Sequence, residues 1–383
     1  MKKPTRSSSL LTVAFCAVLS VLPLCALAEP KSVTQMNETL QFTANSPTRD
    51  FEQTGSAQFS MALSGLGSFE KFQNTGKENY SLSNAQLIVQ GRANLLQYYI
   101  QAGKYLMPGL GEGISSSAAY SPYGEIPHAY LSYELNTHWS LMVGKLLSMP
   151  GYENPFTYQN QNIQRGLLER HNNTISRGVQ FNYRDGSNSF FTTLNDGFYS
   201  GDYKWGGVGG SFAQDLNNTT TLMWGGPLQG VPVQTFVTPL LQNNAQIFNV
   251  IHSLRLGQWS FTPYFQYTYI PAHAVSALPS PISTNGVASI INYKVPADIN
   301  FLGLSGQVHI PLRLERLYIS TNALLTDIES QTFSNANSVT ITPTLQAGIY
   351  YLRAEASHLS SANPLFMRGA SQNRFLIEFG ILY

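Results

Sequence analysis

Charged side chains concentrate in one segment of this sequence, residues 147–173. Asp, Glu, Lys and Arg make up only 11% of the chain, whereas about 25% is usual for a globular protein. Against that background the segment carries both acidic and basic groups, namely Glu153, Arg165, Glu169, Arg170 and His171. Opposed charges across a narrow, partly dehydrated space would set a transverse field and a minimum width. We expect Glu153 to approach Arg165 across such a space, with Arg170 on the same basic side; the alternative is a solvated surface loop.

Residue patterns typical of catalysis or metal binding are missing from the sequence. The seven histidines show no HExxH or other close ligand spacing, and no Gly-x-Ser-x-Gly sequence occurs. The glycine-rich stretch 205–210 is not followed by the Lys-Ser/Thr of a phosphate-binding loop. We therefore expect no catalytic residue, no cofactor and no metal site.

The first 28 residues have the three parts of a secretory signal peptide. A positively charged start precedes an apolar core over residues 10–24, and Ala26-Leu27-Ala28 supplies a small-x-small cleavage site. We expect cleavage after Ala28. Both cysteines, Cys16 and Cys25, would leave with this segment, so the mature chain would contain no disulfide.

The composition of the remaining chain argues against two classes of protein. After residue 28 no stretch of about 18 apolar residues occurs, which disfavours a helical membrane protein. Removal of three signal-peptide cations leaves 19 basic against 21 acidic residues, a net charge of −2. Without a basic excess there is little to neutralise phosphates, so we expect no nucleic-acid partner.

The elements that would position these residues are β-strands with alternating faces. In the last strand, residues 373–383, one face carries Phe375, Ile377, Phe379, Ile381 and Tyr383, and the other carries Arg374, Glu378 and Gly380. The same alternation occurs over 174–184, 258–270 and 338–349. A membrane barrel would turn the apolar face to lipid and the polar face to a wet interior. A soluble sandwich would bury the aromatic face instead, so alternation alone does not orient the sheet.

The spacing of the strands favours a transmembrane barrel. We predict strands at 56–66, 80–91, 95–105, 126–134, 137–146, 174–184, 187–196, 204–214, 218–226, 246–256, 258–270, 298–309, 315–326, 338–349, 350–358 and 373–383. Tight turns at Leu135-Asn136, Asp185-Gly186, Asn217 and Gly257 alternate with long loops at 106–125, 147–173, 227–245, 271–297, 327–337 and 359–372. Short turns on one rim and long loops on the other are typical of outer-membrane barrels.

We therefore predict an all-β, antiparallel up-and-down barrel over residues 56–383, with about 16 strands in a range of 12–18. Residues 29–55 are expected to form a polar periplasmic segment, with a short plug in the lumen as the alternative. The terminal aromatic and the apolar residues before it, Phe379, Ile381 and Tyr383, are predicted to be the signal that the outer-membrane assembly machinery recognises.

Several short motifs follow one another between residues 140 and 200. They are Gly144-Lys145-Leu146-Leu147, Gly151-Tyr152-Glu153, the Asn-rich stretch 160–165, Ser176-Arg177-Gly178-Val179 and Leu194-Asn195-Asp196-Gly197. This order resembles the OmpL-like, porin-2 family of outer-membrane β-barrels. The sequence departs from the family pattern at Gln164 and Arg177, where serine and threonine are expected, and at Asp196, which splits an expected Asn-Gly pair. The resemblance implies a porin-like barrel and no particular substrate.

The leading functional hypothesis is an outer-membrane channel for passive diffusion of small hydrophilic solutes, because barrels of this size hold water. Its expected partners are outer-membrane lipid, lipopolysaccharide, the assembly machinery and the solutes. If the segment 147–173 lies outside the pore, wall residues such as Lys104 and Arg184 would form the constriction. A surface adhesin or receptor with a blocked lumen is the main alternative. A transporter of hydrophobic compounds and an outer-membrane hydrolase are less favoured.

Overall fold

The computed structural model describes the barrel and part of the loops. The described residues are 40, 48–51, 55–72, 75–114, 123–148, 151–229, 244–271, 282–301, 304–320, 336–361 and 371–383. The predicted signal peptide, residues 1–28, and most of the predicted periplasmic segment 29–55 lie outside them.

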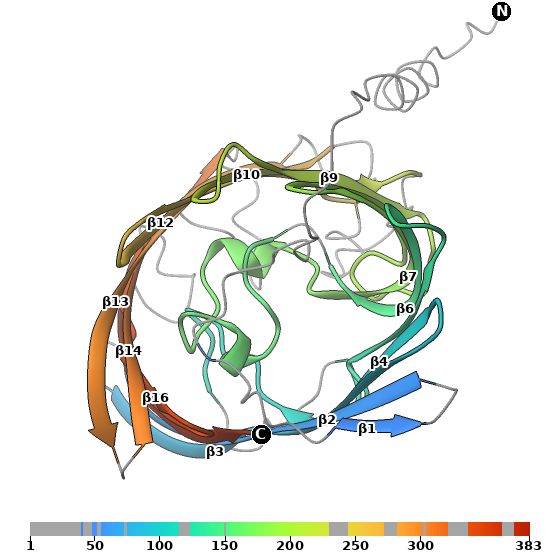
Figure 1. Cartoon of the computed structure of the whole chain (residues 1–383). Helices are drawn as coiled ribbons and strands as arrows, with labels where there is room; N and C mark the ends of the chain where they lie inside the picture. Colours follow the sequence, from blue (N-terminus) through green and yellow to red (C-terminus); the bar gives the residue numbers. More distant parts are fainter. Residues whose placement is uncertain are drawn as a thin grey trace, which may run out of the picture.

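The strands form one closed antiparallel barrel (Figure 1). They are β2 (Gly55–Phe72), β3 (Thr75–Ala93), β4 (Leu96–Tyr105), β5 (His128–Glu134), β6 (Trp139–Leu147), β7 (Ile175–Asp185), β8 (Asn188–Asn195), β9 (Trp205–Ala213), β10 (Asn218–Pro227), β11 (Gln246–Leu256), β12 (Trp259–Ile270), β13 (Ile282–Phe301), β14 (Leu304–Ser320), β15 (Ala336–Ile341), β16 (Thr344–Ala347), β17 (Tyr350–Ser361) and β18 (Ser371–Leu382). Consecutive strands pair, and β18 pairs with β2 from Gln372 opposite Phe72 to Leu382 opposite Ala62.

The ring has sixteen strand positions among the described residues, which confirms the predicted barrel and its size. The segments β15 and β16 share one position, because both pair with β14 on one side and with β17 on the other. A further short strand, β1 (Thr48–Phe51), pairs with the start of β2, beyond the point where Tyr383 meets Met61. β1 and β18 thus pair with successive stretches of the same edge of β2, and β1 lies beyond the C-terminal end of β18.

The two faces of the sheet have opposite character. Along β18 the outward Phe379 is 53% exposed, whereas the inward Glu378 is 0% exposed. The same order holds in β12, where Phe265 is exposed and Gln266 is buried. Apolar side chains outside and polar ones inside suit a barrel surrounded by lipid, so the predicted assignment of the two faces is confirmed.

The tight turns lie where the sequence predicts them. All four predicted tight turns are present. In the first, Asn136 Oδ1 accepts hydrogen bonds from the backbone N–H groups of His138 and Trp139, at 2.9 and 3.0 Å. In two others, Gly186 and Gly257 have φ angles of +51° and +60°, a conformation that glycine adopts without steric cost.

The predicted loop 271–297 is wrong, because β13 begins at Ile282. Strands predicted at 298–309 and 315–326 correspond instead to the end of β13 and to β14. The inward side chains Ala288 and Ile290 are apolar, since a loop packs on them inside the barrel, and this removes the usual alternation. Pro296 lies in the register shift between Val295 and Ile299. Because proline is uncommon within a strand, the sequence pattern places a loop here where β13 continues.

The loop between β6 and β7 folds into the interior of the barrel (Figure 1). We call residues 148–174 the inner loop. It contains two short 3-10 helices, η1 (Thr157–Gln159) and η2 (Leu168–His171), and most of its described side chains are buried. Among the described residues, no helix is long and apolar enough to cross a membrane.

Candidate functional site

One buried arginine of the wall holds the first turn of the inner loop. Arg353 on β17 is fully buried and donates hydrogen bonds to three loop carbonyls, those of Thr157, Asn160 and Gln161, at 2.8–2.9 Å. The same guanidinium lies 3.4 Å from Glu378 on β18. Glu378 in turn accepts a 2.6 Å hydrogen bond from the Thr157 hydroxyl. Because one guanidinium bonds to three backbone carbonyls and a carboxylate, this part of the loop has a fixed position against the wall.

The Asn-rich stretch of the loop is held by an adjacent carboxylate. Glu355 on β17 accepts hydrogen bonds from the backbone N–H of Ile163 at 2.5 Å and from the Gln164 side chain at 2.7 Å. Asn162 donates to Thr342, whose hydroxyl donates to Glu355, both at 2.7 Å. The amide side chains of this motif therefore attach the loop to the wall.

A third anchor involves the preceding long loop as well. Arg374 on β18 lies 3.1 Å from Glu70 on β2 and donates to the carbonyl of Gly109 at 3.0 Å and to the Gln164 side chain. Gly109 also forms an isolated β-bridge with Arg165 of the inner loop. Two loops thus meet on the same buried arginine.

The predicted pairing of Glu153 with Arg165 across the lumen is not present. Glu153 forms a buried ion pair with Arg313 on β14, which also lies 3.3 Å from Glu315. Arg165 lies 3.9 Å from Glu169, on the loop itself. Glu153 accepts a 2.5 Å hydrogen bond from the N–H of Gly166, so Glu153 and the residues after Arg165 are close neighbours rather than opposed groups. The side chain of Arg170 lies outside the described residues.

Burial raises the pKa of Glu153 to about 7, because the charged carboxylate is removed from water and lies close to the negative charges of Glu169 and Glu315. Arg313 opposes this shift without cancelling it. Burial also raises the pKa of Glu169. Acidic side chains outnumber basic ones in this contact, and protonation of one carboxylate relieves part of their repulsion.

Apolar contacts complete the attachment of the loop. Leu167 and Leu168 pack with Ala288 and Ile290 of β13, and a side chain at Gly286 would overlap Leu168, since an added Cβ would lie 2.7 Å from it. At the other end of the loop, Phe156 and Tyr158 pack with Tyr105 and Tyr351.

Leu40 is buried in the same cluster as Phe156 and Tyr158. It belongs to the segment predicted to be a periplasmic tail. This one residue therefore packs inside the barrel, while residues 29–39 and 41–47 lie outside the described part of the chain.

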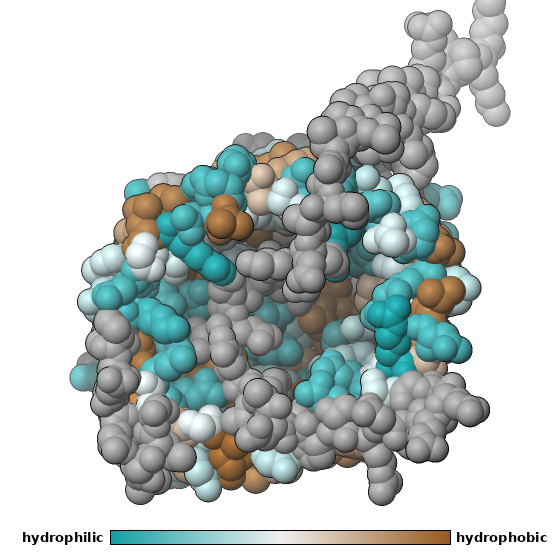
Figure 2. Space-filling model, viewed as in Figure 1, coloured by the Kyte–Doolittle hydropathy of each residue, from teal (hydrophilic) through white to brown (hydrophobic). Residues whose placement is uncertain are grey.

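The wall opposite these anchors is more accessible. We call the inner faces of β14, β17 and β18 the latch wall, and those of β4–β7 the open wall. On the open wall the inward-facing Tyr99, Tyr130, Asn182 and Arg184 are each partly exposed. Figure 2 shows a hollow at the centre of the face, with hydrophilic side chains around it.

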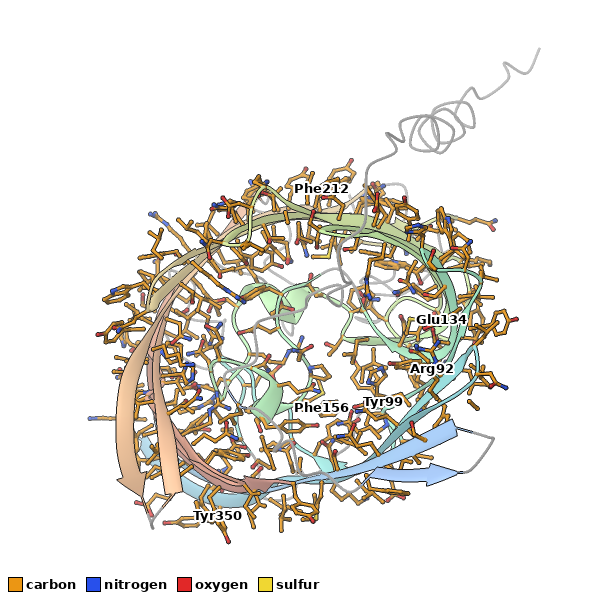
Figure 3. The ribbon with its side chains drawn as sticks, viewed as in Figure 1. Arg92, Tyr99, Glu134, Phe156, Phe212 and Tyr350 are labelled. Carbon is orange, nitrogen blue, oxygen red and sulfur yellow. The ribbon has the colours of Figure 1, made fainter. Side chains whose placement is uncertain are left out.

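Two groups of charge lie on the open wall. Arg92 of β3, at its edge, lies 2.5 Å from Glu134, which also accepts a 2.6 Å hydrogen bond from Gln97. Figure 3 shows Arg92 and Glu134 on the inner side of the ring. Arg184 faces inward, as predicted, and no ion pair to it occurs within the described residues.

The prediction that Lys104 faces the lumen is wrong. On β4, Gln101 and Tyr105 point inward, where they meet Tyr158 and Phe156 of the loop. Side chains of a strand alternate, so Lys104 points outward like Ile100. It pairs there with Glu125 at 2.6 Å.

Four functional candidates were not predicted from the sequence, namely Arg313, Arg353, Glu355 and Glu70. Arg374 and Glu378 were predicted to lie on the polar face of the last strand, but without a partner. A charged residue on the polar face of a lipid-facing strand is the signal that points to such positions, because that face is inside the barrel. No cluster of His, Cys, Asp and Glu suited to a metal ion occurs in the described parts of the chain.

The barrel is similar in fold to several outer-membrane proteins. The outer membrane channel DcaP of Acinetobacter baumannii aligns with a TM-score of 0.58 and 11% identity, over 88% of this chain and 99% of that chain. OmpF of Salmonella typhi, in a complex with daunomycin, gives 0.56 and 9%, over 87% and 99%. OmpT of Vibrio cholerae, in its trimer form, gives 0.55 and 11%, over 86% and 100%. At these identities the likeness concerns the fold alone.

No curated protein matches the chain in sequence. One protein family does: the profile of the family described as "Putative beta-barrel porin-2, OmpL-like" matches residues 50–383. This range extends far beyond the motifs between residues 140 and 200 and includes every strand of the ring. The chain therefore belongs to the OmpL-like, porin-2 family of β-barrels.

Proposed function

We propose that this protein is an outer-membrane channel through which small hydrophilic solutes diffuse passively. The observation that carries the proposal is the contrast between the two walls of the lumen. Most inward side chains of the latch wall are buried, whereas those near the tight-turn ends of the open wall, such as Asn182 and Arg184, are partly exposed. Accessible polar side chains inside a closed barrel are what a water-filled passage requires.

The inner loop would act as the constriction of this passage. It occupies one side of the lumen, and its anchors on Arg353, Glu355 and Arg374 keep it from moving across the other side. Its carboxylates are buried as well, since the side chains of Glu153 and Glu169, which lie beside Arg313 and Arg165, are only 3% and 4% exposed. The loop would therefore set the width of the passage, and the exposed groups of the open wall would set its preference for ions.

Single-channel recording of the refolded mature chain in a planar bilayer tests this proposal. A channel gives stable, unitary ion currents, whereas the surface-receptor alternative with a blocked lumen gives none. Boiled and unboiled samples on a detergent gel must first differ in mobility, because a folded barrel resists detergent until it is heated. A folded protein that inserts without any conductance would overturn the proposal.

A further inference from the structure

Three aromatic rings form a cluster on the open wall. Tyr99 of β4 and Tyr130 of β5 are directly opposite each other in the register. Their rings are stacked, with centroids 5.4 Å apart and planes 6° apart. His128 lies beside both, with its centroid 4.6 Å from Tyr99 and 5.2 Å from Tyr130. Figure 3 shows Tyr99 on the inner side of the ring of strands.

The wall next to this cluster lacks side chains. On the inner face, Tyr130 pairs with Gly144 of β6, and Gly144 pairs with Gly178 of β7. Gly144 and Gly178 therefore add no side chain at this level, and the next one around the barrel belongs to Asn195 of β8, which pairs with Gly178. A flat molecule could lie against the tyrosine ring with the backbone of the two glycines as its floor.

Hydrogen-bonding groups lie on both sides of the cluster. Towards the inner loop, Gln101 accepts a hydrogen bond from the Tyr99 hydroxyl at 2.9 Å and donates one to the Tyr158 hydroxyl at 2.9 Å. Towards the strand ends joined by tight turns, the Arg92–Glu134 ion pair and Gln97 form a second polar group. Gln101 is fully buried and its amide also donates to Gln86, so a ligand on the rings would meet donors and acceptors at the second edge, which the Arg92–Glu134 pair and Gln97 form.

The charges around the cluster argue against an ionic ligand. Aromatic faces carry partial negative charge, which disfavours an anion. Arg92 and Arg184 outnumber Glu134 on this wall, which disfavours a cation. A neutral ring that offers C–H groups on its face and hydroxyl groups at its edge satisfies both conditions.

We infer that the patch formed by Tyr99 and Tyr130, with the buried His128 behind the rings and Gly144 and Gly178 beside them, binds neutral hydroxylated ring compounds, that is, sugars. The ring of the sugar stacks on Tyr130, and its hydroxyl groups bond to the polar group formed by Arg92, Glu134 and Gln97. This inference rests on the proposed function, because it makes the patch a binding station along the passage.

Glucose is the probe that tests it. In single-channel recordings of the wild-type protein, glucose should reduce the current in a concentration-dependent way that saturates. The double variant Tyr99→Leu/Tyr130→Leu should bind glucose about tenfold more weakly than the wild-type protein. Tyr99→Phe/Tyr130→Phe retains both rings and should keep the affinity within about twofold. Tyr133→Leu, on the outer face of the same strand, is the matched control and should behave as wild type.

Two further measurements separate the possible failures. Glucuronate and glucosamine have the same ring with a negative or positive charge, and either one binding more tightly than glucose would overturn the assignment to neutral sugars. Calorimetric titration of glucose into the folded barrel in detergent measures binding without conduction. Binding without conductance would overturn the proposed channel and support the sugar-binding patch. Conductance without glucose binding would overturn the patch alone. Equal binding of glucose by the wild type and the double leucine variant would also overturn the patch alone.

Discussion

The latch wall and the open wall use the same residue types in different ways. On the latch wall, Arg353 and Glu378 are both fully buried. Arg353 donates hydrogen bonds to backbone carbonyls of the inner loop, and Glu378 accepts one from the Thr157 hydroxyl. At the edge of the open wall, Arg92 and Glu134 form a closer ion pair, at 2.5 Å against 3.4 Å, but their side chains are 52% and 29% exposed. Water screens the second pair and is excluded from the first. The same Arg–Glu contact is therefore an anchor on one side of the lumen and an accessible surface on the other.

This difference shows that charge inside a barrel does not by itself mark a selectivity filter. The two carboxylates of the segment that the sequence predicts to be the filter, Glu153 and Glu169, are under 5% exposed and form ion pairs that hold the loop in place. Exposure, and not charge density, decides which groups a passing ion can meet. Four changes to the chain, described next, would sharpen or break this contrast between the walls.

The largest effect is expected from shortening the inner loop. Asn154 and Asn160 hold the ends of a short excursion together by two hydrogen bonds, at 2.7 and 2.8 Å. Deletion of residues 155–159 between them removes Phe156 and Tyr158 from the lumen without stretching the chain. Conductance should rise severalfold, as measured on single channels. An unchanged conductance would mean that the loop does not set the width of the passage.

The next effect should come from Arg353→Met, compared with Arg92→Met on the open wall. Removal of Arg353 leaves Glu378 buried without its cation, which costs about 3–5 kcal/mol. Loss of an exposed pair costs about 0–1 kcal/mol. Denaturant titration of the folded barrel measures the stability, and current noise reports loop movement. Equal losses in the two variants would remove the distinction between the walls.

A smaller effect should appear in ion selectivity. Arg184→Gln removes an accessible positive charge from the open wall and should shift the preference towards cations. Arg165→Gln should shift it less, because the Arg165 side chain is only 12% exposed and lies beside Glu169. Reversal potentials in a salt gradient measure both. A larger shift in the Arg165 variant would restore the loop as the filter.

The smallest effect should be a pH dependence of loop attachment. The pKa of Glu153 is about 7 when the loop is docked, against an ordinary value of about 4.3 in water. The docked state therefore binds more protons between these values, and docking weakens as pH rises from about 4 to 7. Loop-related current noise should increase over that range and level off above it. Glu153→Gln should abolish the dependence; its persistence would assign it to another group.

Much of the barrel follows from local features of the sequence. The alternation of Phe375, Ile377 and Phe379 with Arg374 and Glu378 assigns the two faces of the last strand without knowledge of its neighbours. Turn residues such as Asn136 and Gly186 fix where the chain reverses. The first part of β13 was not predicted, because its inward side chains Ala288 and Ile290 are apolar and the alternation of polar and apolar residues is lost. They are apolar because they pack against the inner loop.

The partners of the inner loop depended on the tertiary structure. Thr157 and Glu378 are 221 residues apart, and Arg353 meets carbonyl groups almost 200 residues away. Such contacts exist only after the ring closes and the register is set, because a shift by one residue would turn each of these side chains outward. The sequence by itself determined that this chain forms a barrel with polar groups inside. Which of those groups are buried under the loop and which remain accessible was decided by the closed ring, since burial depends on what lies opposite in space.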